Sequence, residues 1–398
     1  MALAHISLNE IDDLRLANLI SIGASESIYI DYKRDTYGNG ESAHAEFLAD
    51  IASFANTGGG DLVIGMQESG GVPTQFVPFS GNVDDERLRL EEMARGGLEP
   101  RIPNLQTHSV PLSIGGNVIV VRMPRSFVGP HRVVYRGRSR FWARTSSGKY
   151  EPSVDELRRL FNSVPQLAEQ IRAFRLDRLT RIASGETPVS LAPGECLLVL
   201  HVVPYSAFDL RQSLSTAILV ERWRQFPPLG RSSPTHPMLN FDGLACLSNS
   251  DPWEVGQHSY VQVFRSGAIE GVATVDRSGD GAVSASTVDK YCVASSKRYI
   301  DTLQDFSVEP PYVILASLIN VRGRVVVSGI SGLSPNYIVK AIGRDPLHFS
   351  EVVIEDIASS YQEQALKLRF PLLEQLWNAA GYSSPQTFDR NGKWIFSE

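Results

Sequence analysis

The chain contains the stretch Ala52-Ser53-Phe54-Ala55-Asn56-Thr57-Gly58-Gly59-Gly60, which joins two predicted elements. Before it, apolar residues recur at helical spacing, so the sequence predicts a helix over residues 42–57. The glycines then end that helix and permit a tight turn. A short apolar run follows, and we predict a buried strand over residues 61–66. The pattern therefore indicates a helix, a turn and a strand in immediate succession.

The glycine turn has two interpretations. Its backbone N–H groups could bind an anion, because glycines let the backbone approach a ligand closely. Phosphate cradles usually precede a helix, however, and this turn follows one, which favours a simple helix cap. The sequence also holds neither GxxxxGK[ST] nor GxGxxG. A nucleotide-binding ATPase is therefore the weakest hypothesis, and a titration calorimetry experiment with ATP that shows no heat would dispose of it.

A second candidate element lies upstream and reads Glu26-Ser-Ile-Tyr-Ile-Asp31-Tyr-Lys33. Its alternating character predicts a strand. Asp31 and Lys33 are two residues apart, so on a strand they share one face. Glu26 lies five residues before Asp31 and would point to the other face of an ideal strand. A bend near Ser27 is needed if the two carboxylates are to meet.

A third acid, Glu68, follows the strand predicted over residues 61–66. If it joins Glu26 and Asp31, three carboxylates and Lys33 share one site, and the carboxylates repel one another unless a cation joins them. Mg²⁺ or Mn²⁺ would suit these oxygen ligands, and such a metal activates water and stabilises a phosphoryl transition state. The plainer alternative is a set of surface ion pairs without a catalytic role.

These features together resemble the Schlafen-type AlbA_2 domain family, formerly catalogued as a divergent AAA ATPase domain. The resemblance covers about residues 20–150. It rests on Glu26, on Asp31-Tyr32-Lys33, on the stretch Phe54–Gly59 and on Leu62-Val-Ile-Gly65 followed by an acid. The family's fold implies a mixed α/β (α+β) N-terminal domain.

The resemblance also implies a function, that of a metal-dependent endoribonuclease that cuts structured, tRNA-like RNA in bacterial phage defence or stress response. Glu26, Asp31 and Glu68 would be the catalytic and metal-binding triad for Mg²⁺ or Mn²⁺, with Lys33 assisting. Many members are regarded as nucleic-acid-binding regulators without cleavage, and that remains the alternative. This chain departs from the usual pattern in its shorter Asp31 and in Gln67, which cannot carry charge beside Glu68. Both departures bear on the metal geometry.

A basic run over residues 122–149 gives a second signal for nucleic acid. It has no Asp or Glu, aromatic residues are interleaved, and its cations are Arg122, Arg125, Arg132, Arg136, Arg138, Arg140, Arg144 and Lys149. Cations and aromatic rings suit phosphate contacts and base stacking, so we predict that these eight residues bind RNA or another nucleic acid. The alternation from Arg136 to Arg140 would put three guanidinium groups on one strand face. The alternative is a solvated loop paired with acids of the helix over residues 83–94.

Composition bounds the remaining classes. The chain has 398 residues, 38 Lys and Arg against 44 Asp and Glu, a net charge of −6, and 42% hydrophobic residues. That length favours two domains, and that composition excludes low-complexity disorder and collagen. Only three cysteines occur, far apart, which argues against a disulfide framework and a CxxC zinc site. We see no signal peptide or membrane span, and expect a cytoplasmic protein without a membrane partner.

The predicted organisation has three parts. Residues 1–163 form the AlbA_2-like domain, residues 164–186 a connector helix, and residues 187–398 a second α/β domain that serves dimerisation or sensing. The family's eukaryotic nucleases set two AlbA_2 units side by side as a clamp, whereas this chain has one. By that analogy we expect a homodimer.

Overall fold

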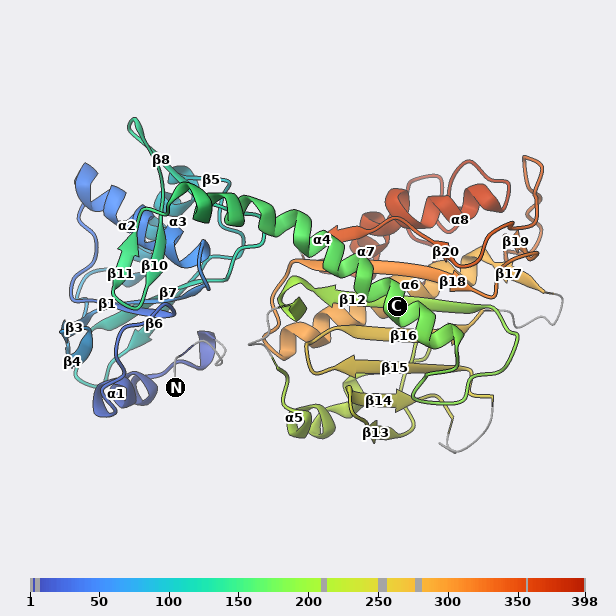
Figure 1. Cartoon of the computed structure of the whole chain (residues 1–398), viewed down its shortest axis with the longest axis horizontal. Helices are drawn as coiled ribbons and strands as arrows, with labels where there is room; N and C mark the ends of the chain where they lie inside the picture. The colour runs from blue at the N-terminus through green and yellow to red at the C-terminus, as the bar shows by residue number, and fades with distance from the viewer. Residues whose placement is uncertain are drawn as a thin grey trace. The chain divides into compact units, whose positions relative to one another are not determined.

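The computed structural model describes residue 3 and residues 8–208, 213–249, 256–275, 281–355 and 357–396 (Figure 1). The chain divides into two compact units, Met1–Ala168 and Glu169–Glu398. Both units combine helices with sheets, so the fold class is mixed α/β as the sequence predicted.

A four-stranded sheet forms the centre of the first unit. Its order is β1–β2–β7–β6, with β1 parallel to β2 and the other pairs antiparallel. The strands are β1 (Ile30–Lys33), β2 (Gly60–Ile64), β6 (Gln106–Pro111) and β7 (Asn117–Met123). The predicted strand over residues 26–33 is thus shortened to its last four residues, because the chain reverses before Ile30.

Helices cover both faces of this sheet. Helices α2 (Glu41–Ala55) and α3 (Val83–Gly97) pack on the face that carries Leu62 and Ile64. Helix α1 (Asp13–Ser21) packs on the other face, with Val63 and Val120. Alternate residues of β2 therefore enter two different cores, as the period of a strand requires.

Three small antiparallel sheets complete the first unit. The pair β3–β4 joins Met66–Ser69 to Val72–Phe76, and the pair β10–β11 joins Ala143–Thr145 to Gly148–Tyr150. The third sheet has the order β5–β8–β9 and consists of Leu98–Glu99, Arg132–Tyr135 and Arg138–Phe141.

The division between the units falls inside helix α4 (Val154–Ala183). The sequence predicted a connector helix over residues 164–186, whereas in the structure this helix already begins at Val154. The helix continues through Pro165, although a proline in a helix interior removes one backbone hydrogen bond and crowds the carbonyl of the preceding turn.

An eight-stranded antiparallel sheet forms the centre of the second unit, in the order β13–β14–β15–β16–β12–β18–β20 with β21 also paired to β18. Its strands are Pro237–Leu239, Gly243–Leu247, Ser259–Phe264, Ile269–Thr274, Leu197–Pro204, Tyr312–Ile319, Leu347–His348 and Val352–Ile354. Strands β17 (Ala282–Ser284) and β19 (Val325–Val327) form a separate parallel pair. The second unit also contains the helices α5 (Thr216–Glu221), α6 (Ala285–Asp305), α7 (Tyr361–Leu368) and α8 (Glu374–Ala379).

Two cores flank this second sheet. Helix α6 contributes to the larger core through residues such as Val288 and Tyr299. The end of α4 contributes Leu179 and Ile182 to the smaller core. The apolar segment Tyr312–Ile319 is the fully buried strand β18.

Candidate functional site

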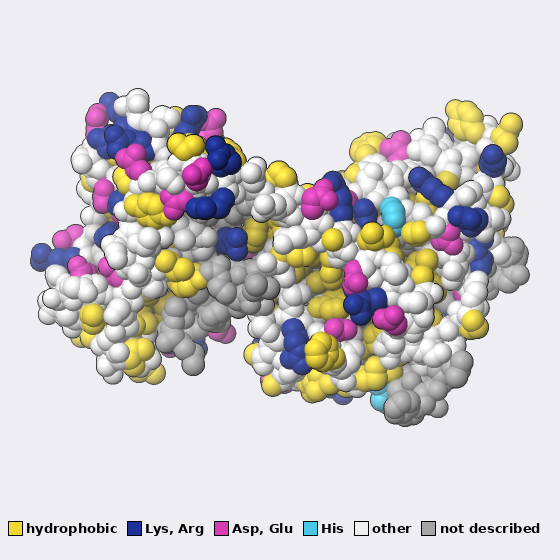
Figure 2. All heavy atoms as spheres, in the orientation of Figure 1, with side chains coloured by type: hydrophobic (Ala, Val, Ile, Leu, Met, Phe, Trp, Pro, Cys, Tyr) yellow, Lys and Arg dark blue, Asp and Glu magenta, His cyan; other side chains and the backbone are white. Residues whose placement is uncertain are grey.

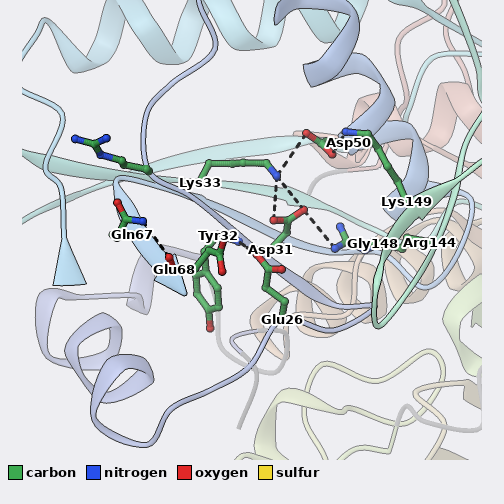
Figure 3. A pocket seen from close by; sticks show the side chains of 11 residues that line it. Glu26, Asp31, Tyr32, Lys33, Asp50, Gln67, Glu68, Arg144, Gly148 and Lys149 are labelled. Carbon is green, nitrogen blue, oxygen red and sulfur yellow. Dashed lines mark hydrogen bonds and ion pairs between the residues drawn. The ribbon is translucent and has the colours of Figure 1, made fainter. Parts of the chain in front are cut away.

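One open pocket of about 380 Å³ in the first unit gathers the acids predicted from the sequence (Figure 3). Glu26, Asp31, Lys33 and Glu68 all line it. Cations of the basic run also reach it, namely Arg144 and Lys149, and so does Asp50 of α2, which the sequence analysis did not single out. Residues from four separate segments therefore meet in a strongly polar site.

Glu26 enters the pocket because the chain reverses just after it. The amide of Ser27 donates to the carbonyl of Ile30 at 3.0 Å, closing a tight turn over residues 28 and 29. This is the bend near Ser27 that convergence of the two carboxylates required. The returning Glu26 carboxylate accepts a hydrogen bond from the amide of Tyr32 at 3.1 Å.

Asp31 and Lys33 extend from the same side of β1, as their spacing predicted. Lys33 Nζ lies 3.2 Å from Asp31 Oδ1 and 4.0 Å from Asp50 Oδ2. Asp31 Oδ2 also accepts from Arg144 Nη2 at 3.3 Å, so this carboxylate faces two cations (Figure 3). Burial alone would lower the pKa of Lys33, but the charges of Asp50 and Asp31 raise it above its ordinary value.

Glu26 and Glu68 meet at the β3–β4 turn. The amide of Glu26 donates to the carbonyl of Gly71, and the amide of Gly71 donates to Glu68 Oε2, both at 2.6 Å. Burial raises the pKa of Glu26 to about 7; the Tyr32 hydrogen bond opposes this rise, and the nearby carboxylates of Asp31 and Glu68 add to it. At neutral pH this carboxyl can therefore hold or release a proton.

Asp50 is the acid that sequence analysis missed. Its side chain is buried, accepts from Tyr37 Oη at 2.6 Å and from Lys149 Nζ at 2.7 Å. Burial raises the pKa of Tyr37 well above its ordinary value, and the charge of Asp50 adds to that rise. A signal was present in the sequence, since Asp50 lies on the helical stripe of Phe47 and Phe54, where an acid needs a buried partner.

The Asn56-Thr57 pair has a positioning role that neither interpretation of the turn foresaw. Asn56 Nδ2 donates to the carbonyls of His131 and Trp142, each at 2.9 Å, and Asn56 Oδ1 accepts from the amide of His131 at 2.7 Å. Thr57 Oγ1 accepts from the amide of Arg144 at 3.0 Å. These bonds tie the end of α2 to the segment that carries Arg144 into the pocket.

The glycines after this pair serve close packing and the turn. Gly60 has a φ of 150°, and a Cβ there would lie 2.5 Å from the carbonyl oxygen of Tyr29. Gly59 has a φ of 71°, and its Cβ would lie 2.4 Å from the amide nitrogen of Arg125. Only glycine fits at either position, which agrees with the helix-cap interpretation.

The basic run is largely paired with acids. At least six of its eight predicted cations form ion pairs: Arg122 with Asp61, Arg132 with Glu99, Arg136 with Glu41, Arg140 with Glu151, Arg144 with Asp31, and Lys149 with Asp50 and Glu46. Figure 2 shows the result, basic and acidic side chains side by side on the upper part of the first unit. The partners are acids from across the unit, and not those of α3 that the sequence suggested.

Arg125 and Arg138 complete the run. The Arg125 guanidinium lies 5.1 Å from the ring centre of Phe127. Arg138 is exposed and makes no ion pair with the residues that the structure describes. The prediction of three arginines on one strand face is wrong, because Arg136 and Gly137, both with positive φ, form the turn before β9. Arg138 and Arg140 alone share that strand.

The acids of the pocket are the candidate ligands for a divalent metal. Within the described residues, no three His, Cys, Asp or Glu side chains are grouped as a preformed metal site. Asp31 already faces two cations. Glu26 and Glu68 make no ion pair with described residues, and their repulsion would be relieved by a cation. Mg²⁺ is commonly held by one or two carboxylates plus water and phosphate oxygens, so Glu26 and Glu68 fit it best.

The comparisons with known proteins identify the domain that holds this pocket. The family model described as "Schlafen, AlbA_2" matches residues 26–153, which include every pocket residue named above. Residues 26–153 form a Schlafen-type AlbA_2 domain. The AlbA_2 family consists of nucleic-acid-binding and nuclease-like proteins.

The other comparisons add little. No curated protein matches the chain. A solved structure, that of the DIP2311 protein from Corynebacterium diphtheriae, is 16% identical, with a TM-score of 0.25, over 35% of this chain. The matched part spans 26% of the DIP2311 chain. In the described part of this chain, no helix is long and apolar enough to cross a membrane.

Proposed function

We propose that the AlbA_2 domain is a metal-dependent endoribonuclease that cuts structured, tRNA-like RNA. The observation that carries this proposal is the pocket itself, which is lined by two carboxylates that form no ion pair with described residues, Glu26 and Glu68, and by the cations Lys33 and Arg144. Acids and cations that line one pocket suit phosphodiester hydrolysis, because a proton leaves the nucleophile while negative charge builds on the phosphate oxygens.

Each residue has a role in this proposal. Glu26 and Glu68 would hold Mg²⁺ or Mn²⁺, which when bound lowers the pKa of water and polarises the phosphate. In the metal-free pocket Glu26 can also take a proton, since its pKa is then about 7. Lys33 would orient water or neutralise phosphate charge, and Asp31 keeps Lys33 in place at 3.2 Å. The pocket-lining Lys149 and the exposed Arg138 would contact RNA outside the reacting group.

The test is purified full-length chain with transfer RNA and either Mn²⁺ or Mg²⁺. We expect cleavage that EDTA abolishes and that Glu26→Gln reduces at least a hundredfold. Glu151→Gln is the matched control, since Glu151 is an exposed acid paired with Arg140 and lies outside the pocket lining. Cleavage unaffected by Glu26→Gln would overturn the proposal.

A second candidate is a nucleic-acid-binding regulator without cleavage. It is favoured by one observation, namely that Asp31 is already neutralised by Lys33 and Arg144 and so is a poor metal ligand. This candidate predicts binding that falls with salt, does not depend on metal and is indifferent to Glu26→Ala. Measuring transfer RNA binding by anisotropy with EDTA and with Mn²⁺ separates the two candidates.

The cellular setting is part of the same proposal. A nuclease of transfer RNA would halt translation, which suits phage defence or a stress response. The second unit would then provide dimerisation or sensing of the trigger. Sedimentation of the purified chain tests the dimer, because a homodimer sediments as twice the chain mass of 43.8 kDa.

A further inference from the structure

Arg144 is an unusual cation for a polar pocket, because it is almost fully buried. It is 4% exposed, and its Cζ lies 3.7 Å from the ring centre of Phe54. The guanidinium nonetheless lines the pocket beside Asp31, as the close-up shows (Figure 3). Its backbone is fixed by Thr57, whose hydroxyl accepts from the Arg144 amide at 3.0 Å.

The hydrogen bonding of this guanidinium is incomplete. Nη2 donates to Asp31 at 3.3 Å, whereas the buried Nε has no partner among the residues that the structure describes. Leaving a donor of a charged group buried and unpaired is unfavourable, so such a group usually marks a ligand or a water site. An acceptor is therefore missing beside Arg144.

Lys33 supplies a second cation at the same place. Its ammonium lies 3.2 Å from Asp31 and its side chain is 32% exposed, so it can turn toward a ligand while it keeps this partner. Asp31 is thus shared by Lys33 and Arg144. Lys33 also lies 4.0 Å from Asp50, whose nearer cation is Lys149 at 2.7 Å, so Lys33 and Arg144 remain the two cations beside Asp31 that an anionic ligand can meet.

We propose that Arg144 and Lys33 form a phosphate-binding subsite in which Asp31 is the shared counter-ion that holds both cations in place. Its ligand is a tetrahedral phosphate group, since a guanidinium fork and a mobile ammonium can each donate to separate phosphate oxygens. The inference deepens the proposed function, because it assigns the place of the RNA phosphate. The subsite itself requires neither cleavage nor a metal.

The test uses inorganic phosphate alone, with the full chain, no RNA and EDTA present, followed by calorimetry or ³¹P NMR at low ionic strength. We expect saturable binding that Arg144→Gln weakens at least tenfold and that Lys33→Met also weakens. Arg158→Gln is the matched control, because Arg158 is an exposed arginine paired with Asp155 at 2.7 Å on α4. It should leave phosphate affinity within twofold.

Arg144→Lys separates loss of the subsite from loss of the fold. This variant keeps the positive charge but loses the planar guanidinium with its several N–H donors. We therefore expect weaker phosphate binding with an unchanged thermal unfolding transition. Absence of saturable binding, or equal weakening by Arg144→Gln and Arg158→Gln, would overturn the subsite. Phosphate binding without RNA cleavage would refute the nuclease and leave the subsite standing. RNA cleavage by the wild type, together with unaltered phosphate binding in Arg144→Gln, would refute the subsite and leave the nuclease standing.

Discussion

Glu26 shows at the scale of one residue how neighbours set chemistry. Its ordinary pKa of 4.5 rises to about 7, chiefly because the carboxyl is partly buried, and further because Asp31 and Glu68 repel its charge. The Tyr32 amide, which donates to Glu26 Oε1 at 3.1 Å, limits this rise. The same carboxyl is thus suited to proton transfer and is destabilising when ionised.

That raised pKa predicts a pH-dependent stability. Between pH 4.5 and about 7 the unfolded chain ionises Glu26 while the folded protein retains the proton, so the free energy of unfolding falls as pH rises through this window. The fall is on the order of 1 kcal/mol, because solvent screens a partly exposed group. Thermal melts at several pH values should show it in the wild type and not in Glu26→Gln. An identical pH profile in both proteins would contradict the assignment.

Asp50 marks the limit of prediction at this scale. Glu26, Asp31, Lys33 and Glu68 could be found because each belongs to a short motif, whereas Asp50 is defined by partners far along the chain. Tyr37 lies 13 residues away from it and Lys149 lies 99 residues away. A local pattern shows an acid on an apolar helix face, but not which cation will neutralise it.

At the scale of elements, the Asn56 side chain fastens the end of α2 to the segment around β8 and β10. Its two hydrogen bonds to His131 are buried and the one to Trp142 is partly buried, so Asn56→Ala leaves backbone groups unpaired. We expect a loss of about 2–3 kcal/mol in the first unit. Hydrogen exchange of the His131 amide should quicken at least tenfold, whereas the exposed Asn162→Ala should change nothing. An unchanged exchange rate at the His131 amide would contradict the view that Asn56 fastens these segments together.

The arginines of α4 show why charge patterns mislead. Arg172, Arg175, Arg178 and Arg181 are spaced like a solvated stripe, yet Arg178 is buried and bonds both oxygens of Glu270, at 2.9 and 3.1 Å. Helix spacing alone cannot show that Glu270, 92 residues away on β16, meets Arg178.

Glu270 is fully buried, and it makes Arg178 indispensable to the second unit. Burial would raise the pKa of Glu270, but hydrogen bonds from His201 and Arg178 lower it to about 2. Arg178→Met leaves the buried Glu270 carboxylate without its guanidinium partner. We therefore expect the free energy of unfolding, measured with urea, to fall by about 3–5 kcal/mol. Arg181→Met is the control one turn later, since Arg181 is exposed and paired with Asp177 at 3.0 Å. Equal losses in the two variants would show that the buried Arg178–Glu270 pair contributes no more to stability than the exposed Arg181–Asp177 pair.

For the whole molecule, the net charge of −6 and the basic run over residues 122–149 gave opposite expectations about nucleic acid. The structure reconciles them through pairing, because acids distant in sequence neutralise most of the run. Domain roles and the homodimer stay predictions. The surface available for RNA is therefore smaller than the sequence alone indicated.

This pairing predicts a shallow salt dependence of RNA binding. Eight free cations would give a slope of log K against log salt near −7, at about 0.9 per neutralised phosphate. If only the proposed contacts Arg138, Arg144, Lys149 and Lys33 engage phosphate, the slope is about −3.6. Fluorescence anisotropy with transfer RNA, in EDTA and over a range of KCl concentrations, measures it. A slope steeper than about −6 would mean that RNA displaces the intramolecular acids and recruits the whole run. Arg138→Gln should make the slope shallower by about one.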